Sequence, residues 1–189
     1  TFDMTGQLLA QPQVEFSCFW NTRWIENEKE VPVDHDAIDK DGNLNPTGFA
    51  LAIWGKFPPN RMVAVSPVTN DTAGCSIVAY SGFDAGPGTL QVYLINKREE
   101  TASVRIEVPG FRTVSVTQAW EYAGRSPDDR KPVWQERKVA RSSTVFDLTG
   151  LSITVITMKI ERESEARTYY FDPVSGDDSL CGTSAANAF

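Results

Sequence analysis

The stretch LQVYLINKREETASVRIEV, residues 90–108, decides the fold. In its first half every second residue is Leu or Val, at positions 90, 92 and 94. In its second half Val104, Ile106 and Val108 alternate with Arg105 and Glu107. A β-strand turns successive side chains to opposite faces. The period of two therefore predicts two strands, each with one face on a core and the other toward solvent or a neighbouring domain.

Similar alternating runs extend from residue 61 to residue 160, at the spacing typical of an antiparallel β-sandwich. Gly and Pro occupy connections between the runs, as in DAGPG at 84–88 and PG at 109–110, where tight turns need them. The predicted fold class is mainly β: a sandwich of about eight strands, preceded by an α/β segment. The predicted strands are Met62–Ser66, Ser76–Ser81, Leu90–Asn96, Ser103–Val108, Val114–Tyr122, Val133–Val139, Thr144–Leu148 and Ser152–Ile160.

Residues 1–60 have the pattern of an α/β unit. Met4, Leu8 and Leu9 have helical spacing, and Pro12 ends that helix. The apolar run Val14–Trp20 predicts a buried strand, and a polar loop follows over residues 21–45.

A second helix is predicted from residue 46 to residue 57. Asn45 is its expected N-cap and Pro46 its first helical residue. The expected apolar stripe of this helix consists of Phe49, Ala52, Ile53 and Phe57. Residues 161–189 start with a charged run and end in Gly, Ser and Asp. The sequence therefore divides into residues 1–60, 61–160 and 161–189.

Composition excludes several classes of protein. The chain has 189 residues, 41% of them hydrophobic, which is far from the signature of disorder. Its net charge of −7 repels phosphate backbones, so we expect no nucleic-acid partner. No apolar run reaches the roughly 18–20 residues of a membrane span. The three cysteines form no C-x-x-C pair. The chain starts with Thr, without a signal peptide, and we expect it to be an internal segment of a longer polypeptide.

The most informative short motif is VEFSCFWNTRW, residues 14–24. Its strand would deliver Trp20, Asn21, Arg23 and Trp24 at the carboxyl end, where ligands bind in a (β/α) barrel. Indole faces stack on the C–H faces of sugar rings, and Asn and Arg bond hydroxyl or anionic groups. The alternative is that both tryptophans anchor a core or a loop. The residues alone leave the two interpretations equally weighted.

Other candidate sites fail on inspection. Glu15 begins its predicted strand, which is the structural end in a barrel, so we expect a salt bridge. The acidic run at 34–45 resembles a calcium loop, but alignment on Gly42 places Ala37 and Gly48 at essential ligand positions. A polar turn leading into the helix cap is the better interpretation. His35, the single histidine, is expected to be solvated. We expect no metal and no cofactor.

The strings QLLAQPQVEFSCFWNTRW (7–24), DAIDKDGNLNPTG (36–48) and FALAIWGKF (49–57) resemble the end of the catalytic barrel in glycoside hydrolases. The nearest likeness is to family 86 β-agarases and β-porphyranases, with arabinofuranosidases and β-xylosidases more distant. Residues 78–108 look like the β-sandwich appended to such barrels. The tail TYYFDPVSGDDSLCGTSAANAF (168–189) resembles the opening of a parallel β-helix domain; a flexible polar terminus is the alternative.

This resemblance implies that Val14–Trp20 is the eighth barrel strand and that the helix after Asn45 is the eighth helix. Trp20 would then form the floor of the sugar-binding site, and Asn21, Arg23 and Trp24 would be nearby contacts. These families hydrolyse polysaccharides with two carboxylates on earlier barrel strands. A complete barrel takes about 250 residues, so we expect these 189 residues to be inactive alone. The resemblance also implies that the whole enzyme is secreted, that its substrate is a galactan, and that the upstream part of the barrel is the partner of this segment.

Two other functions stay open. A carbohydrate-binding or adhesion module predicts a planar aromatic patch, from Trp120 or Trp134, on the outside of the sandwich. A sandwich that only braces the barrel predicts that its aromatic residues belong to the core. The hydrolase fragment predicts that residues 1–60 pack against one sheet and expose a broken edge where barrel strands belonged.

Overall fold

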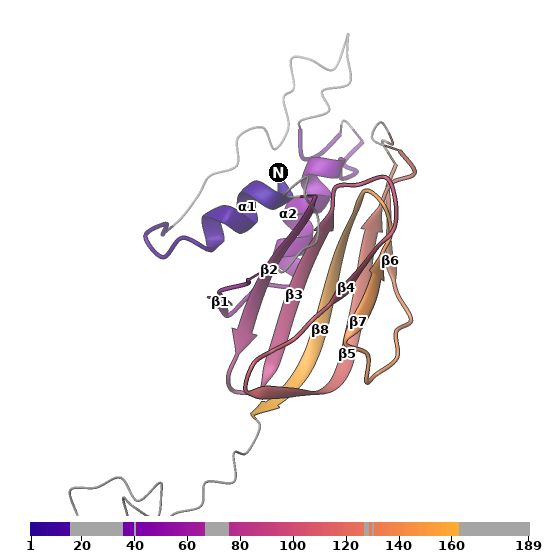
Figure 1. Ribbon diagram of the computed structural model, residues 1–189. Coiled ribbons are helices and arrows are strands. Elements are labelled where there is room, and N and C mark those ends of the chain that lie inside the picture. The colour runs from indigo at the N-terminus through magenta and orange to yellow at the C-terminus, as the bar shows by residue number, and fades with distance from the viewer. Residues whose placement is uncertain (16–35, 40, 67–75, 127–128, 130, 163–189) are drawn as a thin grey trace, which may run out of the picture.

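A computed structural model describes residues 1–15, 36–39, 41–66, 76–126, 129 and 131–162 of the chain. Within these residues two helices precede eight strands, six of which form one large sheet (Figure 1). In chain order the elements are α1 (Phe2–Leu9), α2 (Pro46–Lys56), β1 (Arg61–Val63), β2 (Ile77–Asp84), β3 (Thr89–Asn96), β4 (Ala102–Arg105), β5 (Phe111–Ala123), β6 (Val133–Glu136), β7 (Val145–Leu148) and β8 (Ser152–Arg162).

The strands form a six-stranded sheet in the order β1-β2-β3-β8-β5-β6 and a two-stranded sheet of β4 and β7. Every neighbouring pair is antiparallel. The predicted mainly β, antiparallel architecture is confirmed, and each of the eight predicted runs overlaps one strand. The runs at 62–66, 103–108 and 133–139 were predicted too long, because β1, β4 and β6 end after three or four residues.

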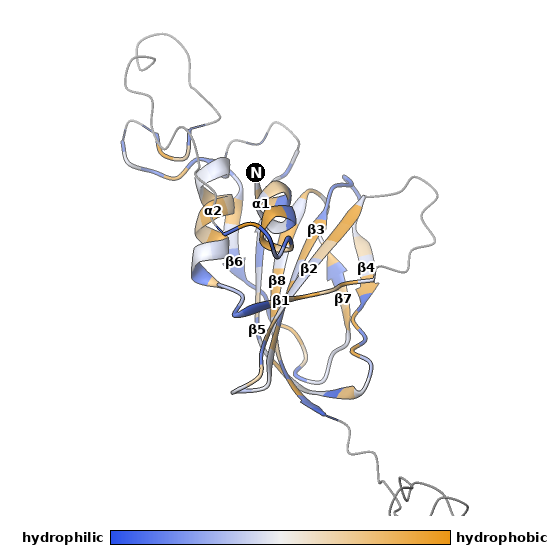
Figure 2. Ribbon diagram, turned by 90° about the vertical axis from the view of Figure 1, so that its left-hand side faces the viewer, coloured by the Kyte–Doolittle hydropathy of each residue, from blue (hydrophilic) through white to orange (hydrophobic). Residues whose placement is uncertain are grey.

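The core between the two sheets is built from the alternating residues that predicted the strands. Leu90, Val92 and Leu94 all point into it, together with Phe146 and Leu148 of β7. The same alternation continues in β8, whose residues 156, 158 and 160 are buried in this core. Figure 2 shows β4 and β7 on one side of the large sheet and the two helices on the other.

The second face of the large sheet is covered by the helices. Phe2 of α1 stacks on Trp54 of α2, with ring centroids 4.7 Å apart. The Trp54 ring lies 4.2 Å from that of Tyr93 on β3. Phe57 and Ile53 complete this buried contact. Residues at the start of the chain therefore pack against one sheet, as the hydrolase-fragment hypothesis predicts.

The buried stripe of α2 differs from the predicted one by a rotation of one residue. The buried residues have the spacing i, i+3, i+4, i+7 and are Ala50, Ile53, Trp54 and Phe57. Ala52 is exposed. The sheet presents Tyr80 and Tyr93 to the helix, and the large indole of Trp54 fills the space between them. Of the predicted stripe, Ile53 and Phe57 are buried and Phe49 packs against the core on Tyr122, so the prediction was wrong only for Ala52 and missed Trp54.

The packing of α1 also corrects its predicted face. Met4 is 54% exposed and Leu9 is 43% exposed, whereas Phe2 and Gly6 are buried. A Cβ atom at Gly6 would lie 2.5 Å from the ring of Tyr80, so only glycine lets α1 approach the sheet this closely. The apolar stripe predicted from Met4 and Leu9 is the outer side of the helix.

The described part of the link between the two helices agrees with the predictions made from the sequence. Asn45 is the N-cap of α2 and Pro46 its first residue, as predicted. The Asn45 Nδ2 donates to the Asp36 carbonyl oxygen at 3.0 Å, and its side chain accepts no capping hydrogen bond from the helix. Asp39 accepts backbone N–H groups of Asp41 and Asn43, which confirms the polar turn. Val14 and Glu15 lie outside any strand. The rest of the predicted strand at 14–20 falls outside the described residues.

A buried carboxamide ties the two sheets together at one end. Asn96, on β3, is 1% exposed. Its Nδ2 donates to the carbonyl oxygens of Glu100 at 2.8 Å and Thr149 at 3.0 Å, and its Oδ1 accepts from the Arg98 N–H. The carbonyl of Thr149 directly follows β7. This side chain therefore supplies hydrogen bonds that neither sheet's own ladder provides.

We predict that Asn96→Ala lowers the free energy of unfolding by about 3 kcal/mol, because buried carbonyl groups lose their donors. Urea denaturation measures the loss. Gln118→Ala removes a carboxamide of the same class from an exposed position and is expected to change stability by less than about 0.5 kcal/mol. Equal stability of the two variants would contradict this role for Asn96.

Candidate functional site

The residues predicted to contact sugar all fall in one unplaced segment. Trp20, Asn21, Arg23 and Trp24 lie outside the described residues, so their role stays a prediction. Glu15 is described and exposed. The three cysteines and the single histidine also lie outside the described part, at Cys18, Cys75, Cys181 and His35. The described part of the chain includes α1, which precedes this segment in the sequence, and α2, which follows it.

A polar network fixes the start of α1 to the sheet. The Tyr80 hydroxyl donates to the Asp3 carboxylate, and Lys97 Nζ lies 2.7 Å from Asp3 Oδ2. The indole Nε1 of Trp54 donates to the Phe2 carbonyl oxygen at 3.2 Å. Burial and the adjacent carboxylate raise the pKa of Tyr80, so its phenol remains a donor. These contacts hold α1 at a fixed position on β2.

Asp3 is the titrating member of this network. Burial pulls the pKa of its carboxyl upward, but hydrogen bonds from Lys97, Tyr80 and Gln7 outweigh burial, and the pKa is below its ordinary value of 3.8. A carboxyl whose pKa is depressed by folding stabilises the fold above its unfolded pKa. That stabilisation disappears as the pH falls through the folded pKa.

We predict that Asp3→Asn destabilises the chain at pH 7 and that the difference from the unsubstituted chain vanishes as the pH is lowered below about 3.8, toward the folded pKa. Thermal unfolding from pH 7 to pH 2.5 measures both proteins. The acid-side measurement is the internal control. A destabilisation of the same size at both ends of the range would show that packing, not ionisation, holds α1.

The two tryptophans of the sandwich pack against the end of α2. Trp120 and Trp134 are half-buried and stacked, with centroids 5.2 Å apart and planes 10° apart. Phe57 lies 6.0 Å from the Trp134 ring, and Lys56 Nζ lies 4.0 Å above the Trp120 ring. Such a cation–π contact is worth about 0.5–1 kcal/mol. The pair is therefore part of the joint between helix and sheet, as the bracing hypothesis predicts, and is not a bare outer platform.

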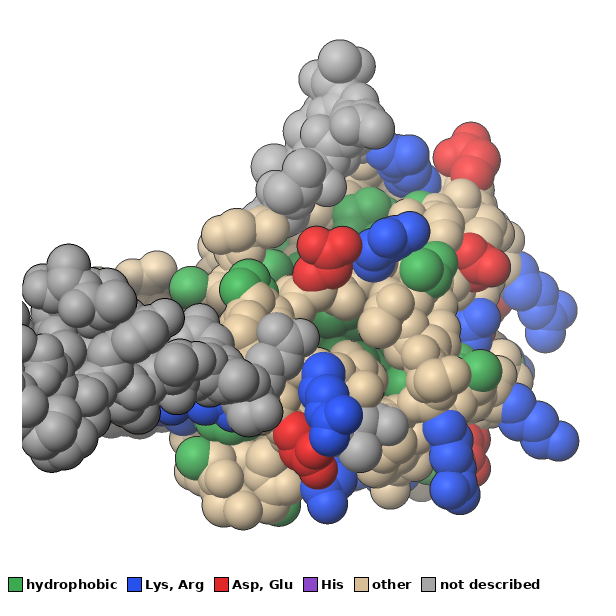
Figure 3. Space-filling model, turned by 60° about the horizontal axis from the view of Figure 1, so that its bottom comes forward, with side chains coloured by type: hydrophobic (Ala, Val, Ile, Leu, Met, Phe, Trp, Pro, Cys, Tyr) green, Lys and Arg blue, Asp and Glu red, His purple; other side chains and the backbone are tan. Residues whose placement is uncertain are grey.

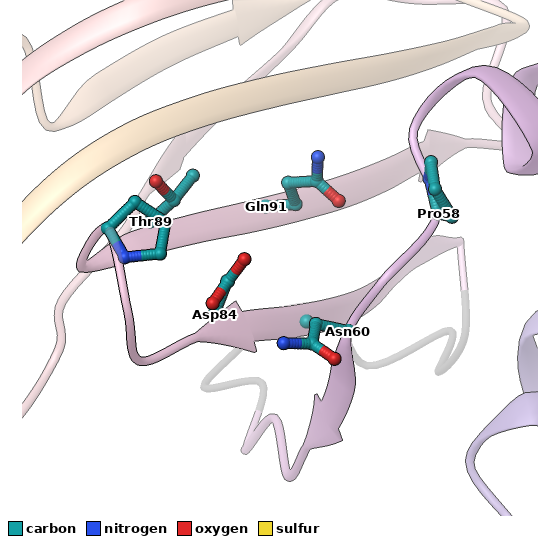
Figure 4. A pocket seen from close by; sticks show the side chains of 7 residues that line it. Pro58, Asn60, Asp84, Thr89 and Gln91 are labelled. Carbon is teal, nitrogen blue, oxygen red and sulfur yellow. The ribbon is translucent and has the colours of Figure 1, made fainter.

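A small polar pocket opens on the helix side of the sheet, beyond the end of α2. Its volume is about 120 Å³. Figure 4 shows Asp84 and Thr89, at the turn between β2 and β3, with Gln91 and Asn60 around a common space. Pro58, Gly82 and Pro87 complete the lining. Sequence analysis assigned residues 84–88 only to a turn and did not predict this site. The available signal was polar Thr89 and Gln91 on the face opposite Leu90.

Metal-ligand clusters, surface charge and helix length can be assessed for the described residues. Within the described ranges, no group of three or more His, Cys, Asp or Glu side chains is placed to hold a metal ion. Figure 3 shows basic and acidic side chains interspersed on the face that it displays. Neither described helix has the length and apolar character that a bilayer crossing requires. The expectations of no cofactor and no nucleic-acid partner stay predictions.

Comparisons with known proteins support the fold at the level of structure. No family model and no curated protein matches the sequence. An arabinose-bound family 51 α-L-arabinofuranosidase matches with a TM-score of 0.50 and 14% identity, over 62% of this chain and 20% of that chain. A bifunctional glucanase-xylanase from a metagenome library matches with a TM-score of 0.45 and 19% identity, over 67% and 24% of the two chains. An α-L-arabinofuranosidase from Thermotoga maritima matches with a TM-score of 0.46 and 18% identity, over 65% of this chain and 31% of that chain.

The chain thus spans about a fifth of the length of the family 51 enzyme. At 14% identity this likeness concerns the fold alone. The fold of this chain is similar to part of a glycoside hydrolase. The predicted likeness to such enzymes is confirmed at that level, whereas the likeness to family 86 in particular has no support among the matches.

Proposed function

We propose that this chain is part of a secreted polysaccharide-degrading glycoside hydrolase, in which the sandwich braces the last strand and helix of a catalytic barrel. The observation that carries the proposal is the aromatic joint between the helices and the large sheet, formed by Phe2, Trp54 and Tyr93. An adhesion module has no need of such a joint. A brace needs a rigid one, since sugar-contact residues must be held in place to bind a substrate.

The substrate proposed is a galactan, neutral or sulfated, on the strength of the resemblance of residues 7–57 to family 86. In this proposal Trp20 and Trp24 stack on sugar rings, Asn21 bonds ring hydroxyls, and Arg23 bonds a hydroxyl or a sulfate. Hydrolysis itself requires a pair of carboxylates supplied by earlier barrel strands. We therefore propose that these 189 residues bind saccharide but do not cleave it.

We predict that the double variant Trp20→Ala, Trp24→Ala weakens binding of an agarose-derived tetrasaccharide by about tenfold or more, because two stacking surfaces are lost. Isothermal titration calorimetry measures the affinity of the full 189-residue chain. Glu28→Gln, a change in the same loop without an aromatic ring, is the matched control and is expected to bind like the unsubstituted chain.

An unchanged affinity in the double variant would remove the proposed sugar site. A hydrolysis assay on agarose and on porphyran gives the second readout, and we expect no product. Turnover by the 189-residue chain would show that its active site lies elsewhere than on absent barrel strands.

A further inference from the structure

The helix-facing side of the large sheet changes from apolar to polar residues between one row of paired residues and the next. Its upper rows, defined by strand register, are apolar: Tyr80 pairs with Tyr93, Tyr93 with Val155, and Val155 with Trp120. The helices cover these rows. The next two rows toward the β2–β3 turn, here called the polar rows, are Gly82, Gln91, Thr157 and Gln118, then Asp84, Thr89, Lys159 and Ser115.

The change occurs where α2 ends. The hydroxyl of Tyr93, in the last apolar row, donates to the carbonyl oxygen of Phe57, the C-cap of α2. Beyond this point the segment Pro58–Asn60 runs past the polar rows toward β1. Gly82 permits this path, because a Cβ atom there would lie 2.4 Å from Pro59. The polar pocket is the space between this segment and the turn.

The side chains of the pocket are held in defined orientations. The Gln91 carboxamide lies 2.9 Å from the Tyr93 hydroxyl oxygen, a contact that orients the carboxamide beside the pocket and leaves its other end able to bond outward. Asp84 Oδ1 accepts the N–H of Gly86 at 3.2 Å, which leaves Oδ2 as an acceptor. Asn60 and Thr89 add a carboxamide and a hydroxyl. The site therefore combines donors and acceptors that are partly preorganised.

The charge of the lining restricts the ligand. Asp84 is its one ionisable side chain, and no basic residue lines the pocket. A carboxylate repels phosphate, sulfate and carboxylate groups. Carboxamides, a hydroxyl and a carboxylate match the alternating donors and acceptors of vicinal hydroxyl groups, and Pro58 and Pro87 offer apolar surface to C–H groups. A neutral, hydroxyl-rich ring fits this set.

We propose that the polar pocket is a second saccharide subsite, which binds one neutral sugar ring through Asn60, Asp84 and Gln91. The ligand is assigned to the pocket alone, and the polar rows beyond it on β8 and β5 lie outside the subsite on the same face. The choice of polysaccharide as ligand rests on the proposed function. The residues are distinct from the predicted site at Trp20–Trp24, and the two sites are tested separately.

The test is calorimetric titration of the 189-residue chain with the neutral agarose-derived tetrasaccharide. We expect Gln91→Ala and Asp84→Ala each to weaken binding by about tenfold, the effect of one charge-assisted or well-oriented hydrogen bond. Asn60→Ala, at an exposed position in a connecting segment, gives a third variant whose folding is expected to be unchanged. Gln118→Ala removes the same side-chain type two strands beyond β3 on the same face and is the matched control.

Each outcome separates the two sites. Weaker binding in the Asn60, Asp84 and Gln91 variants with normal binding in the Gln118 variant supports the subsite. If only the Trp20, Trp24 variant loses affinity, the subsite is wrong and the proposed function stands. If only the pocket variants lose affinity, the subsite stands and the sugar site at Trp20 is wrong. Absence of binding by the unsubstituted chain overturns both.

A sulfated tetrasaccharide of the same length adds a test of the charge argument. The comparison uses the Trp20→Ala, Arg23→Ala, Trp24→Ala variant, because Arg23 is itself proposed to bond a sulfate. Because Asp84 faces the ligand, we expect this variant to bind the sulfated compound more weakly than the neutral one, and we expect an added Asp84→Asn to reduce that difference in affinity. Tighter binding of the sulfated compound to this variant would overturn the assignment of a neutral ring to this pocket.

Discussion

The burial of Trp54 between Phe2 and Tyr93 is the contact on which the rest of the structure depends. It joins the first helix, the second helix and the centre of the large sheet in one stack. Truncation of a buried tryptophan typically costs about 3–5 kcal/mol. Without this stack, α1 would keep its polar contacts through Asp3 and the close approach of Gly6 to Tyr80, and the sheet would expose aromatic rings on its second face.

This joint divides the second face of the sheet into two regions with different roles. Where the helices lie, the rows are aromatic and aliphatic, and the polar atoms of Trp54 and Tyr93 reach backbone carbonyls. Past Phe57 the rows become Gln, Thr and Lys, and the surface is open to ligands. One face thus serves both as a brace for a helical layer and as a polar surface beside it, because the alternation of each strand continues while the residue type changes.

The sequence predicted most of the fold, because strands with one buried face carry a period of two that needs no tertiary information. It also predicted both helices, but it assigned part of their buried faces wrongly. Both the stripe with Ala52 and the stripe with Trp54 fit α2, and only the rings on the sheet decide between them. It also missed the pocket, since Asn60 and Asp84 meet only through the pairing of β1 with β2. The residues at 20–24 predict sugar contacts from their chemistry alone.

Native-state hydrogen exchange tests the central claim most directly, namely that helices and sheet form one unit through the Trp54 stack. The account predicts that amides in the middle of α2 exchange with the same opening free energy as those of β3 and β8, and that Trp54→Ala releases α2 while the sheet stays protected. If α2 in the unsubstituted chain exchanged through a separate, much cheaper opening, the helices would be a loosely attached appendage and the brace would be wrong.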